Sequence, residues 1–488
     1  MMSSATQLET AQVVHAIAAA VKNRGGRALL VGGSVRDELL GLPRKDYDLE
    51  IFGLDPAAIE PLVRQHGPVE EVGRAFGILK LRVGVSEIDV AAPRRESKVG
   101  PGHKGFAVAT DPTMKPAEAA RRRDFTINAI AKDPLTDELI DPFGGQKDLV
   151  DKTLRLVDER SFGDDPLRVL RAFQFAGRFG LNIENNTAAV LEQMVPAVAE
   201  LPPDRLYAEW RKLFLLSPRP SLGLELARRV GYFDRFAPII AKLKDTLQEP
   251  TFHPEGDVWA HTMLVVDDTK RLVDRSDLPD DERLMVMLTA FGHDVGKALT
   301  TRPIDGKIRS FGHAEAGVGV MADFLEHQGF PAHLVERVKP LIREHMMADI
   351  LFAAEQRGPG PVKDGAVRRL INRLHPASLE QLLLVTEGDI LGRGRLPDDR
   401  YAHPENIAAL KNWWRGRVAK LKLQKGPVPI IQGRDLISLG WSPGPIFGRI
   451  IKAAEKLAEE KSYDREKILD LLRSADSPDQ ALERFPPP

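Results

Sequence analysis

Residues 29–53 read LLVGGSVRDELLGLPRKDYDLEIFG, and this stretch decides the fold of the chain. It begins within a short apolar run, 28–31, which predicts a buried strand. Gly32 and Gly33 then interrupt the apolar pattern. Ser34 stands where the N-cap of a helix would lie, ahead of the helical sequence SVRDELLG. The stretch therefore predicts a strand, a glycine turn and a helix in succession.

A pair of carboxylates follows the next turn. Asp46 and Asp48 lie two residues apart in KDYDLEIF, so a strand would place both on one face, close to each other. The glycine turn and its helix offer free backbone N–H groups to an anion, and the carboxylates offer hard oxygen ligands to Mg²⁺. Alone, such a pair is more often two solvated acids on a hairpin. Its distance from the glycine turn favours a site for phosphoryl or nucleotidyl transfer.

The composition limits the class of protein. A chain of 488 residues is too long for one core, so we expect about two to four domains. Because there is no cysteine, disulfides, thiolate metal sites and cysteine nucleophiles are excluded. The N-terminus has no apolar signal segment and no window approaches a membrane span, so we expect a cytoplasmic protein without a membrane partner. The net charge of −1 restricts any RNA contact to local basic patches.

A third carboxylate, Asp89, lies in SEIDVAAPRRE, where alternating apolar and polar residues predict a half-buried strand. On a strand beside Asp46 and Asp48 it would complete a site for two metal ions, and otherwise it is an acid on an edge strand. The predicted helix and the four predicted strands of this region cover residues 5–24, 27–31, 46–52, 77–84 and 86–92.

Basic residues dominate the next two segments. Residues 94–113 are rich in glycine, lysine and arginine, and we predict a mobile loop that attracts phosphate. In RRRDFTINAIAKDP, Arg122 and Arg123 precede Asp124, and Asn128 follows four residues later, one helical turn away on the same face. Three consecutive arginines, taken alone, are usually a solvated helix end.

The segment SFGDDPLRVLRAFQFAGRFGL lies in a region, 151–230, that we predict to be helical. Its apolar stripe leaves Asp165 and Arg168, three residues apart, together on another face. These two side chains form either an intrahelical ion pair or a pair presented to a ligand. We expect Arg171 and Arg178 to meet RNA phosphates or neighbouring acids.

The motifs GGSVRD, D-x-D, RRDFTINA and DDPLR resemble the signature of the bacterial tRNA nucleotidyltransferase and poly(A) polymerase family, class II of the DNA polymerase beta nucleotidyltransferase superfamily. The resemblance implies that Asp46 and Asp48 hold Mg²⁺ and that Asp89 helps to align the primer 3′-OH. It implies that the family's ED-x-x-R motif hydrogen-bonds the incoming base, with Asp164 here in place of the usual Glu. The residues that the resemblance assigns to nucleotide binding are Gly32, Gly33, Ser34, Arg36, Arg122, Arg123, Asp124, Asn128, Asp165, Arg168 and Arg171.

Histidines become frequent after residue 251 and recur in VWAHT, AFGHDVGK, FGHAEAG and IREHM. With two aspartates they form a set suited to a metal site of imidazole and carboxylate ligands: His261, His293, Asp294, His313, His345 and Asp389. Their order resembles the HD phosphohydrolase domain, which implies a divalent metal such as Ni²⁺, Mn²⁺ or Mg²⁺ that activates water for phosphoester hydrolysis. The alternative is a degenerate domain that is kept for packing.

The segment KNWWRGRVAKLKLQKG, 411–426, combines six basic residues and no acid with Trp413 and Trp414. This mixture suits RNA backbone contact and equally suits an amphipathic helix whose tryptophans lie in a core.

The resemblance covers essentially the whole chain and implies an α+β fold, with a small mixed-sheet palm followed by helical domains. The expected domains are a nucleotidyltransferase palm over 1–150, a neck and body with the template helix over 151–250, an HD domain over 251–395 and a tRNA-contacting tail over 396–488.

The function implied is addition of CMP, CMP and AMP from CTP and ATP to the 3′ end of tRNA, together with a metal-dependent phosphohydrolase. Three alternatives stay open. One is a poly(A) polymerase, although such relatives usually lack an HD domain. Another is a specialist that adds only CC or only A. The third is an HD phosphohydrolase whose palm only binds RNA, which the intact set of Asp46, Asp48 and Arg123 argues against.

Overall fold

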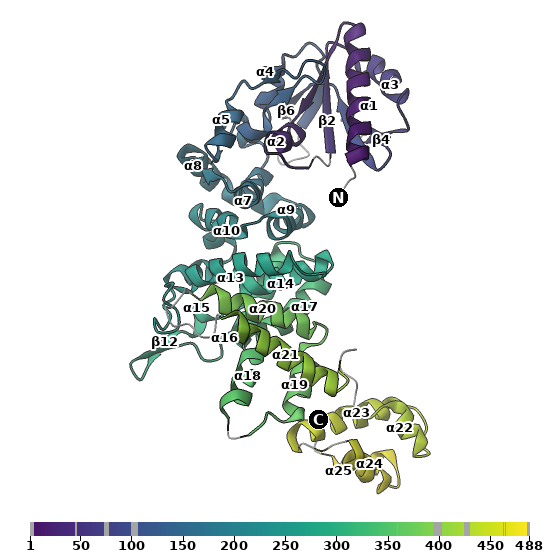
Figure 1. Ribbon diagram of the computed structural model, residues 1–488, viewed down its shortest axis with the longest axis vertical. Helices are drawn as coiled ribbons and strands as arrows, with labels where there is room; N and C mark the ends of the chain where they lie inside the picture. The colour runs from purple at the N-terminus through teal and green to yellow at the C-terminus, as the bar shows by residue number, and fades with distance from the viewer. Residues whose placement is uncertain are drawn as a thin grey trace. The chain divides into compact units, whose positions relative to one another are not determined.

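The computed structural model describes residues 4–43, 46–72, 78–98, 106–358, 360–393, 403–423, 430–461, 463 and 465–485. The chain divides into two compact units, Met1–Phe236 and Ala237–Pro488 (Figure 1). The described strands of the first unit include a seven-stranded sheet, and the regular elements described in the second unit are helices and one short hairpin. The predicted α+β class, a mixed-sheet palm followed by helices, is confirmed.

The sheet has the strand order β3-β4-β5-β2-β1-β8-β9. Its strands are β1 (Arg27–Val31), β2 (Asp46–Phe52), β3 (Val69–Val72), β4 (Ile78–Val83), β5 (Ser86–Ala91), β8 (Ala131–Lys132) and β9 (Leu139–Ile140). Neighbouring strands β2 and β5 run parallel, and the other neighbours run antiparallel, so the sheet is mixed. The four predicted strands are present with ends within a residue of the prediction. Strand β3 was not predicted, because its sequence VEEV is short and acidic.

Two helices cover the sheet, α1 (Ser4–Asn23) and α3 (Pro56–Arg64). Figure 1 shows α1 lying along the sheet, where it packs on β1, β4 and β5. Val14, Ile17 and Val21 repeat at helical spacing on α1 and are buried. The predicted helix over 5–24 is therefore confirmed.

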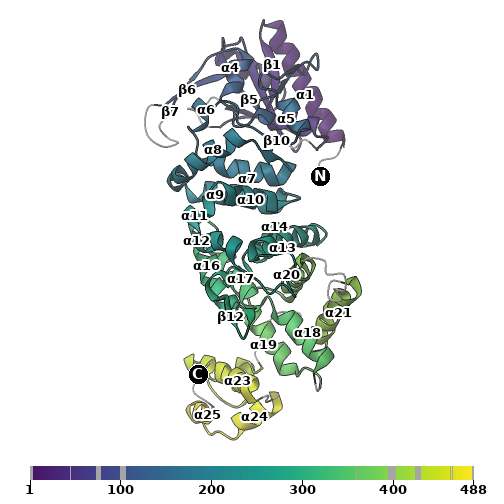
Figure 2. The ribbon, with the colours of Figure 1, turned by 90° about the vertical axis from the view of Figure 1, so that its left-hand side faces the viewer.

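Strands β6 (Arg94–Lys98) and β7 (Phe106–Thr110) form an antiparallel hairpin beside the sheet (Figure 2). The prediction of an irregular loop over 94–113 is wrong in these two segments. The alternating sequence FAVAT of β7 has the β-branched and aromatic residues that favour a strand, and it pairs with the basic segment that precedes it. Residues 99–105 lie outside the described part.

The remaining elements of the first unit are mostly helical. They are α2 (Gly33–Leu39), α4 (Pro116–Arg121), η1 (Thr126–Asn128), α5 (Gly145–Val150), β10 (Thr153–Leu154), α6 (Glu159–Phe162), α7 (Leu167–Phe179), β11 (Asn182–Ile183), α8 (Asn185–Met194), η2 (Val195–Glu200), α9 (Pro203–Leu216), α10 (Pro220–Arg229) and α11 (Tyr232–Phe236). An aromatic core joins α7, α9 and α11, with ring centroids of Phe173 and Tyr232 5.4 Å apart and those of Trp210 and Tyr232 5.7 Å apart. These ring contacts fix the position of α7, which forms one wall of a cavity in the first unit.

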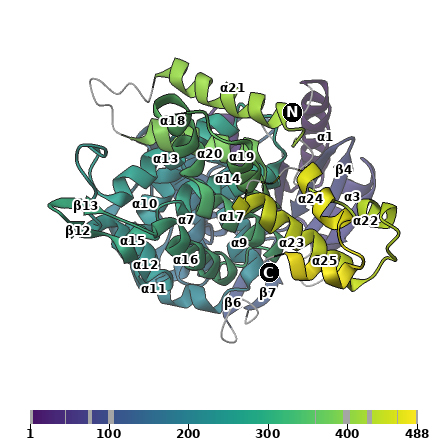
Figure 3. The same ribbon diagram turned by 90° about the horizontal axis from the view of Figure 1, so that it is seen from below.

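The second unit consists of helices and one hairpin. They are α12 (Pro238–Ala241), η3 (Lys242–Asp245), α13 (Val258–Val273), α14 (Asp280–Gly292), α15 (Lys297–Thr300), β12 (Arg302–Ile304), β13 (Lys307–Arg309), α16 (His313–His327), α17 (Ala332–Glu344), α18 (Met347–Arg357), α19 (Asp364–Leu374), α20 (Leu379–Gly392), α21 (Pro404–Lys420), α22 (Gly433–Ser438), α23 (Pro445–Lys461), α24 (Arg465–Arg473) and α25 (Pro478–Arg484). Helices α13, α14, α17 and α20 pack against one another at its centre (Figure 3). Within the described ranges, none of the helices has the length and apolar content needed to cross a bilayer.

Helix α21 resolves the ambiguity of the Trp-rich segment. Trp414 is fully buried and its indole N–H donates to the Ala348 carbonyl at 3.0 Å. Basic side chains of the helix pair with acids of the same unit, as Lys411 does with Glu387 at 2.6 Å. The segment is thus an amphipathic helix whose Trp414 lies in the core. The end of the segment, 424–429, lies outside the described part.

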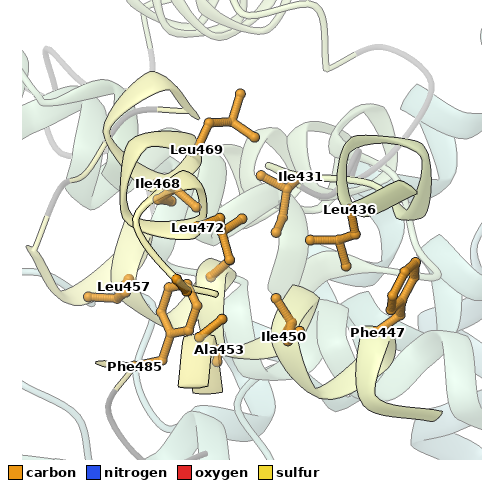
Figure 4. Packing of buried hydrophobic residues seen from close by; sticks show 13 residues of the cluster. Ile431, Leu436, Phe447, Ile450, Ala453, Leu457, Ile468, Leu469, Leu472 and Phe485 are labelled. Carbon is orange, nitrogen blue, oxygen red and sulfur yellow. The ribbon is translucent and has the colours of Figure 1, made fainter. Parts of the chain in front are cut away.

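The C-terminal helices have an apolar core of their own, which we call the tail core. Its buried members are Ile431, Leu436, Phe447, Ile450, Ala453, Ala454, Leu457, Ile468, Leu469, Leu472, Ala475, Ala481 and Phe485 (Figure 4). They come from α22, α23, α24, α25 and the segments beside them, so the predicted helical tail is present as a packed module.

Candidate functional site

Residues that lie far apart in the sequence line one cavity of the first unit, with a volume of about 590 Å³. It is walled by the β1–α2 turn, by β2, by the segment before η1, and by α7 and α9. The predicted residues that line it are Gly32, Gly33, Ser34, Arg36, Asp48, Arg123, Asp124, Asn128, Asp165, Arg168 and Arg171. The fold therefore brings together almost all of the nucleotide-binding residues that the resemblance implied.

The N-cap of α2 lies two residues earlier than predicted. Gly32 adopts a φ of +72° and is itself the N-cap of α2, which starts at Gly33. The prediction that Ser34 is the N-cap is wrong, because the left-handed glycine lets the helix begin before it. The Ser34 hydroxyl donates instead to the Val31 carbonyl at 3.1 Å. A Cβ on Gly32 would lie 2.6 Å from Nη1 of Arg123, so the glycine also makes room for a guanidinium against the turn.

The carboxylates lie on neighbouring strands. In the parallel pair of β2 and β5, Asp48 is directly opposite Asp89, so the two side chains share a face. The backbone of Asp46 lies two residues before Asp48 in β2, and its side chain lies outside the described part. Within the described ranges, oxygen Oδ1 of Asp89 is buried without a hydrogen-bond donor, and Nζ of Lys80 lies 3.5 Å from it. A buried carboxylate oxygen without a donor, beside a second carboxylate, fits the ligand set that Mg²⁺ requires.

A chain of buried hydrogen bonds crosses the cavity floor. Arg36 donates to Asn128 Oδ1 at 2.5 Å, Asn128 donates to Asp124 Oδ1 at 2.9 Å, and Arg171 donates to Asp124 Oδ2 at 2.7 Å. Burial alone would raise the pKa of Asp124, but the charge of Arg171 and these hydrogen bonds hold that pKa below its ordinary value. Asp124 therefore stays ionised. It holds the Arg171 guanidinium directly, and it holds Arg36 through the Asn128 amide.

The backbone that joins Asp124 to Asn128 is not the helix that we predicted. We predicted that they lie one helical turn apart, whereas α4 ends at Arg121 and only the short η1, Thr126–Asn128, follows. The side chains still meet because the 3₁₀ turn folds back on Asp124, whose carboxylate also accepts from the Phe125 N–H at 2.8 Å.

The adjacent cations Arg122 and Arg123 point to different places. Arg123 lines the cavity, and burial lowers its pKa while Glu50 and Asp48 oppose that effect. Arg122 instead donates to Glu50 Oε1 at 2.7 Å and is not among the lining residues. The Arg122 carbonyl accepts a hydrogen bond from Nη2 of Arg168 at 2.6 Å.

The pair Asp165 and Arg168 is not intrahelical. Helix α7 begins at Leu167, so Asp165 precedes it, and its carboxylate accepts from the Leu167 N–H at 3.1 Å. Among the described residues, the ion pair of Asp165 is with Arg205 at 3.4 Å. The Arg168 guanidinium donates to two backbone carbonyls, those of Arg122 and of Ser161 at 3.0 Å. Both side chains line the cavity and are therefore available to a ligand there.

Six cavity residues were not predicted to line it: Asp37, Gln174, Phe175, Arg178, Lys212 and Leu216. Gln174 is 2% exposed, and its Nε2 is buried without an acceptor among the described residues. Its position three residues after Arg171 on α7 was the signal in the sequence, since that spacing continues one row along a helix. Arg178 meets Asp37 at 3.7 Å, in accord with the expectation of a neighbouring acid.

The second unit gathers the predicted histidines and aspartates into one buried cluster, which we call the HD cluster. Group A comprises His261, His293 and Asp389, group B comprises His313 and His345, and Asp294 belongs to both. Oxygen Oδ2 of Asp294 lies 3.3 Å from Nε2 of His293, and Oδ1 lies 3.2 Å from Nε2 of His313. Nε2 of His261 is 3.1 Å from Asp389 Oδ1. Asp294 thus stands between two sets of ligands, as a bridging carboxylate would.

Backbone carbonyls orient three of the rings. Nδ1 lies 2.9 Å from the Ala290 carbonyl in His293, 2.8 Å from that of Ser310 in His313, and 2.7 Å from that of Ile342 in His345. A ring nitrogen that faces a carbonyl must donate, so the neutral form of each ring has its Nε2 bare and directed into the cluster. Burial and the charge of His293 lower the pKa of His345 to about 3. Neutral imidazoles of this tautomer are metal ligands, so the residues present fit a divalent ion.

His261 differs from these three rings because both of its nitrogens face carboxylates. Nδ1 is 2.8 Å from Glu255 Oε1, and Nε2 faces Asp389. Burial would lower the pKa of His261, but these two hydrogen bonds raise it to about 9. Glu255 was not predicted, and its sequence context HPEGD gave no signal for it.

Family models match two parts of the first unit. The "Poly A polymerase head domain" matches residues 28–155, and the "Probable RNA and SrmB- binding site of polymerase A" matches residues 180–244. The first of these spans the cavity residues from Gly32 to Asn128.

Two solved structures share the fold. The crystal structure of the Bacillus stearothermophilus CCA-adding enzyme in complex with CTP aligns with a TM-score of 0.60 at 21% identity, over 96% of this chain and 97% of that one. A tRNA nucleotidyltransferase complexed with a primer tRNA and an incoming ATP analog aligns with a TM-score of 0.52 at 24% identity, over 83% of this chain and 99% of that one.

A curated relative extends the similarity over both units. The multifunctional CCA protein of Methylococcus capsulatus is 32% identical over 471 residues, which are 95% of this chain and 99% of the relative. With that identity over nearly the full length, and with a cavity that unites the nucleotidyltransferase motifs, the chain belongs to the bacterial CCA-adding enzyme family of tRNA nucleotidyltransferases.

Proposed function

We propose that the chain adds CMP, CMP and AMP from CTP and ATP to the 3′ end of tRNA. The observation that carries this proposal is the single cavity in which the glycine turn, Asp48, Arg123 and the pair Asp165 and Arg168 meet. The related proteins are named for CCA, and the two structures of the same fold hold CTP in one case and a primer tRNA with an ATP analog in the other. These substrates are of the kind that the cavity's cations and hydrogen-bonding groups would bind.

The phosphate end of the cavity lies at the β1–α2 turn. Arg123 and the backbone N–H groups from Gly32 to Ser34 are placed to bind the triphosphate, because anions bind where cations and unpaired N–H groups converge. Asp46, Asp48 and Asp89 would hold Mg²⁺, which when bound neutralises the charge that develops on the reacting phosphate. The primer 3′-oxygen forms a bond to the α-phosphorus, and the bond to pyrophosphate breaks.

The base end of the cavity is formed by Asp165 and Arg168. Arginine is a planar array of donors that suits acceptors on a base, and aspartate accepts from an exocyclic amine, which both cytosine and adenine carry. The carbonyls of Arg122 and Ser161 hold the guanidinium in place before any base arrives. We propose that this pair selects C and A against U and G.

Incubation of tRNA transcripts that end in the discriminator base, in -C and in -CC with CTP and ATP tests this proposal. The expected result is completion of all three to -CCA and no further growth. Extension by many A residues would indicate a poly(A) polymerase, and extension of only some substrates would indicate a CC- or A-adding specialist. Failure to extend any of them, with Asp48→Ala as the matched negative control, would overturn the proposal.

A second activity is favoured by the HD cluster. We propose that the second unit hydrolyses 2′,3′-cyclic or 2′-phosphoesters with a divalent metal held by groups A and B. When bound, the metal would supply an activated water. Support comes from the buried convergence of four imidazoles on Asp294 and from the ring tautomers, which leave three Nε2 atoms bare. A degenerate packing domain would gain nothing from this arrangement of polar groups.

Metal analysis and hydrolysis assays test the second activity. The purified protein should hydrolyse 2′,3′-cyclic nucleotides in Ni²⁺, Mn²⁺, Co²⁺ or Mg²⁺, and His293→Ala should abolish this. If the protein binds no ion and hydrolyses no ester with any of these metals, the proposal is wrong and the HD cluster serves only packing.

We further propose the fourfold division into palm, neck and body, HD domain and tail as the functional subdivision of the two compact units.

A further inference from the structure

We propose that groups A and B bind metal with unequal affinity, and that Glu255 is the positioning residue that makes group A the tighter one. This inference rests on the proposed metal-binding role of the HD cluster. It concerns the order in which the cluster fills and the residue that determines that order.

The evidence begins with the partners of the ring nitrogens. His293, His313 and His345 each direct Nδ1 at a neutral backbone carbonyl. His261 alone directs Nδ1 at a carboxylate, Oε1 of Glu255, at 2.8 Å. The Glu255 side chain is 4% exposed and that of His261 is fully buried, so water does not weaken their interaction.

A carboxylate at the far nitrogen has two effects on a histidine ligand. It fixes the ring in one orientation, and it makes the bare nitrogen more basic and hence a better ligand. His253 strengthens the arrangement, because its Nδ1 lies 2.9 Å from the same Oε1 and holds the carboxylate from its other side. The loop before α13 therefore helps to orient His261, which lies on α13 itself.

The charges near the two groups also favour metal binding at group A. Group A has the carboxylate of Asp389, a share of Asp294, and Glu255 behind its ring. Cations pair with the first two: Arg393 lies 3.4 Å from Asp389 Oδ2, and Lys297 Nζ lies 2.6 Å from Asp294 Oδ2. Group B has Asp294 besides two imidazole rings. Glu255 therefore gives group A its additional negative charge. Because a divalent cation gains more energy from more nearby negative charge at low dielectric, group A should fill first.

The set His253, Glu255 and His261 has ligand atoms close enough to hold an ion by itself. The geometry points away from that use. An ion there would need the Nδ1 atom of His261 that donates to Glu255, while Nε2 already belongs to group A. We therefore assign Glu255 to orientation of His261, and a third equivalent of bound metal would contradict the assignment.

The test is a Mn²⁺ titration of the full-length, metal-stripped protein, with free Mn²⁺ followed by electron paramagnetic resonance. The expected result for the wild type is two equivalents in two affinity classes. Glu255→Gln keeps size and shape but removes the charge, and should weaken the tight class by about 10- to 100-fold while leaving the weak class unchanged. His345→Ala should remove the weak class alone. The matched control is Glu249→Gln, a carboxylate of the same loop that accepts from the Ile308 N–H instead of from a histidine.

Each outcome separates this inference from the proposed activity. Absence of any Mn²⁺ binding would overturn the metal-binding proposal itself. Two equal sites in the wild type, or a Glu255→Gln profile that matches Glu249→Gln, would overturn the inference while leaving that proposal intact. If Glu255→Gln does not fold, as judged by circular dichroism, the wild-type and His345→Ala titrations still decide whether the affinities differ.

Discussion

Arg168 illustrates how single residues are prepared for their role before a ligand binds. Burial lowers its pKa, and the charges of Asp124 and Asp165 oppose that effect, so a cation is held in an environment of low dielectric. Its two acceptors are main-chain carbonyls, of Arg122 and Ser161, and neither is an anion that could neutralise it. The full positive charge is therefore available to a base or phosphate in the cavity.

We predict that Arg168→Ala loses nucleotide selectivity. A site built to hydrogen-bond a base rejects analogues that leave its buried groups unpaired, and one such contact provides about 1–3 kcal/mol of discrimination. The variant should incorporate CTP and ATP poorly and lose about ten- to a hundredfold of its preference over UTP and GTP. The measurement is incorporation of each of the four nucleotides into tRNA that ends in -C. Asp164→Glu, which restores the family's usual residue, should be near neutral, and wild-type selectivity in Arg168→Ala would show that base choice lies elsewhere.

Asp124 gives a prediction for pH dependence. Folding lowers its pKa below the ordinary value of an aspartate. Its ionised form therefore contributes stability that is fully present above that ordinary value and is lost as pH falls through the folded pKa. Asp124→Asn should lower the free energy of unfolding at pH 7 by about 3 kcal/mol, because Arg171 would lose its buried anion. The difference from wild type should shrink below about pH 4. Urea unfolding from pH 7 to pH 3 measures both, and a difference that does not change with pH would contradict the assignment.

At the scale of elements, the β1–α2 turn connects backbone conformation to chemistry. Position 32 requires glycine for two reasons. Its φ is positive, and a Cβ there would lie 2.6 Å from Nη1 of Arg123. The turn therefore determines where a phosphate-binding cation lies. A side chain there would shift both the N–H groups of α2 and the guanidinium.

We predict that Gly32→Ala keeps the fold and loses about ten- to a hundredfold of kcat/KM for CTP, because displaced groups no longer align the triphosphate. The matched control is Gly41→Ala. Gly41 also has a positive φ, +67°, but a Cβ there meets nothing within 4 Å. Both variants should lose about 1 kcal/mol of stability from the strained backbone, and only Gly32→Ala should lose activity. Equal activity loss in the two would show that strain, and not the contact with Arg123, is responsible.

The elements also show what the sequence could and could not predict. Strand β1 followed from its apolar run, strand β5 from its alternation of apolar and polar residues, and helix α1 from the helical spacing of its apolar residues. The start of α2 was misplaced by the conformation of Gly32, which no pattern of polarity specifies. The hairpin of β6 and β7 was missed because its first strand, RRESK, has no apolar alternation and depends on its partner. Glu255 was missed because its contact with His261 is tertiary.

At the scale of the whole molecule, the cavity and the HD cluster lie in different compact units. The cavity residues belong to Met1–Phe236 and the HD cluster to Ala237–Pro488. The ion pairs and hydrogen bonds described for each site stay within its own unit. Each chemistry should therefore tolerate loss of the other.

We predict a double dissociation in the full-length protein. Asp48→Ala should abolish nucleotide addition and keep phosphoester hydrolysis and metal content, whereas His293→Ala should do the reverse. Both assays on both variants, with Glu60→Ala on the surface of α3 as the control, measure this. A variant that loses both activities while its thermal unfolding matches wild type would show that the two units are coupled.

The tail core has a consequence for how the chain opens under native conditions. All of its buried members lie between Ile431 and Phe485, so a set of helices at the end of the chain shares one apolar interior. Segments that share an interior open together, and their amide protons exchange with a common free energy. Hydrogen exchange should therefore report α23 and α24 as one cooperative unit that opens without exposing the HD cluster. A single apolar-to-charged change such as Ile450→Asp should make this unit sensitive to proteases while the remainder of the chain stays protected.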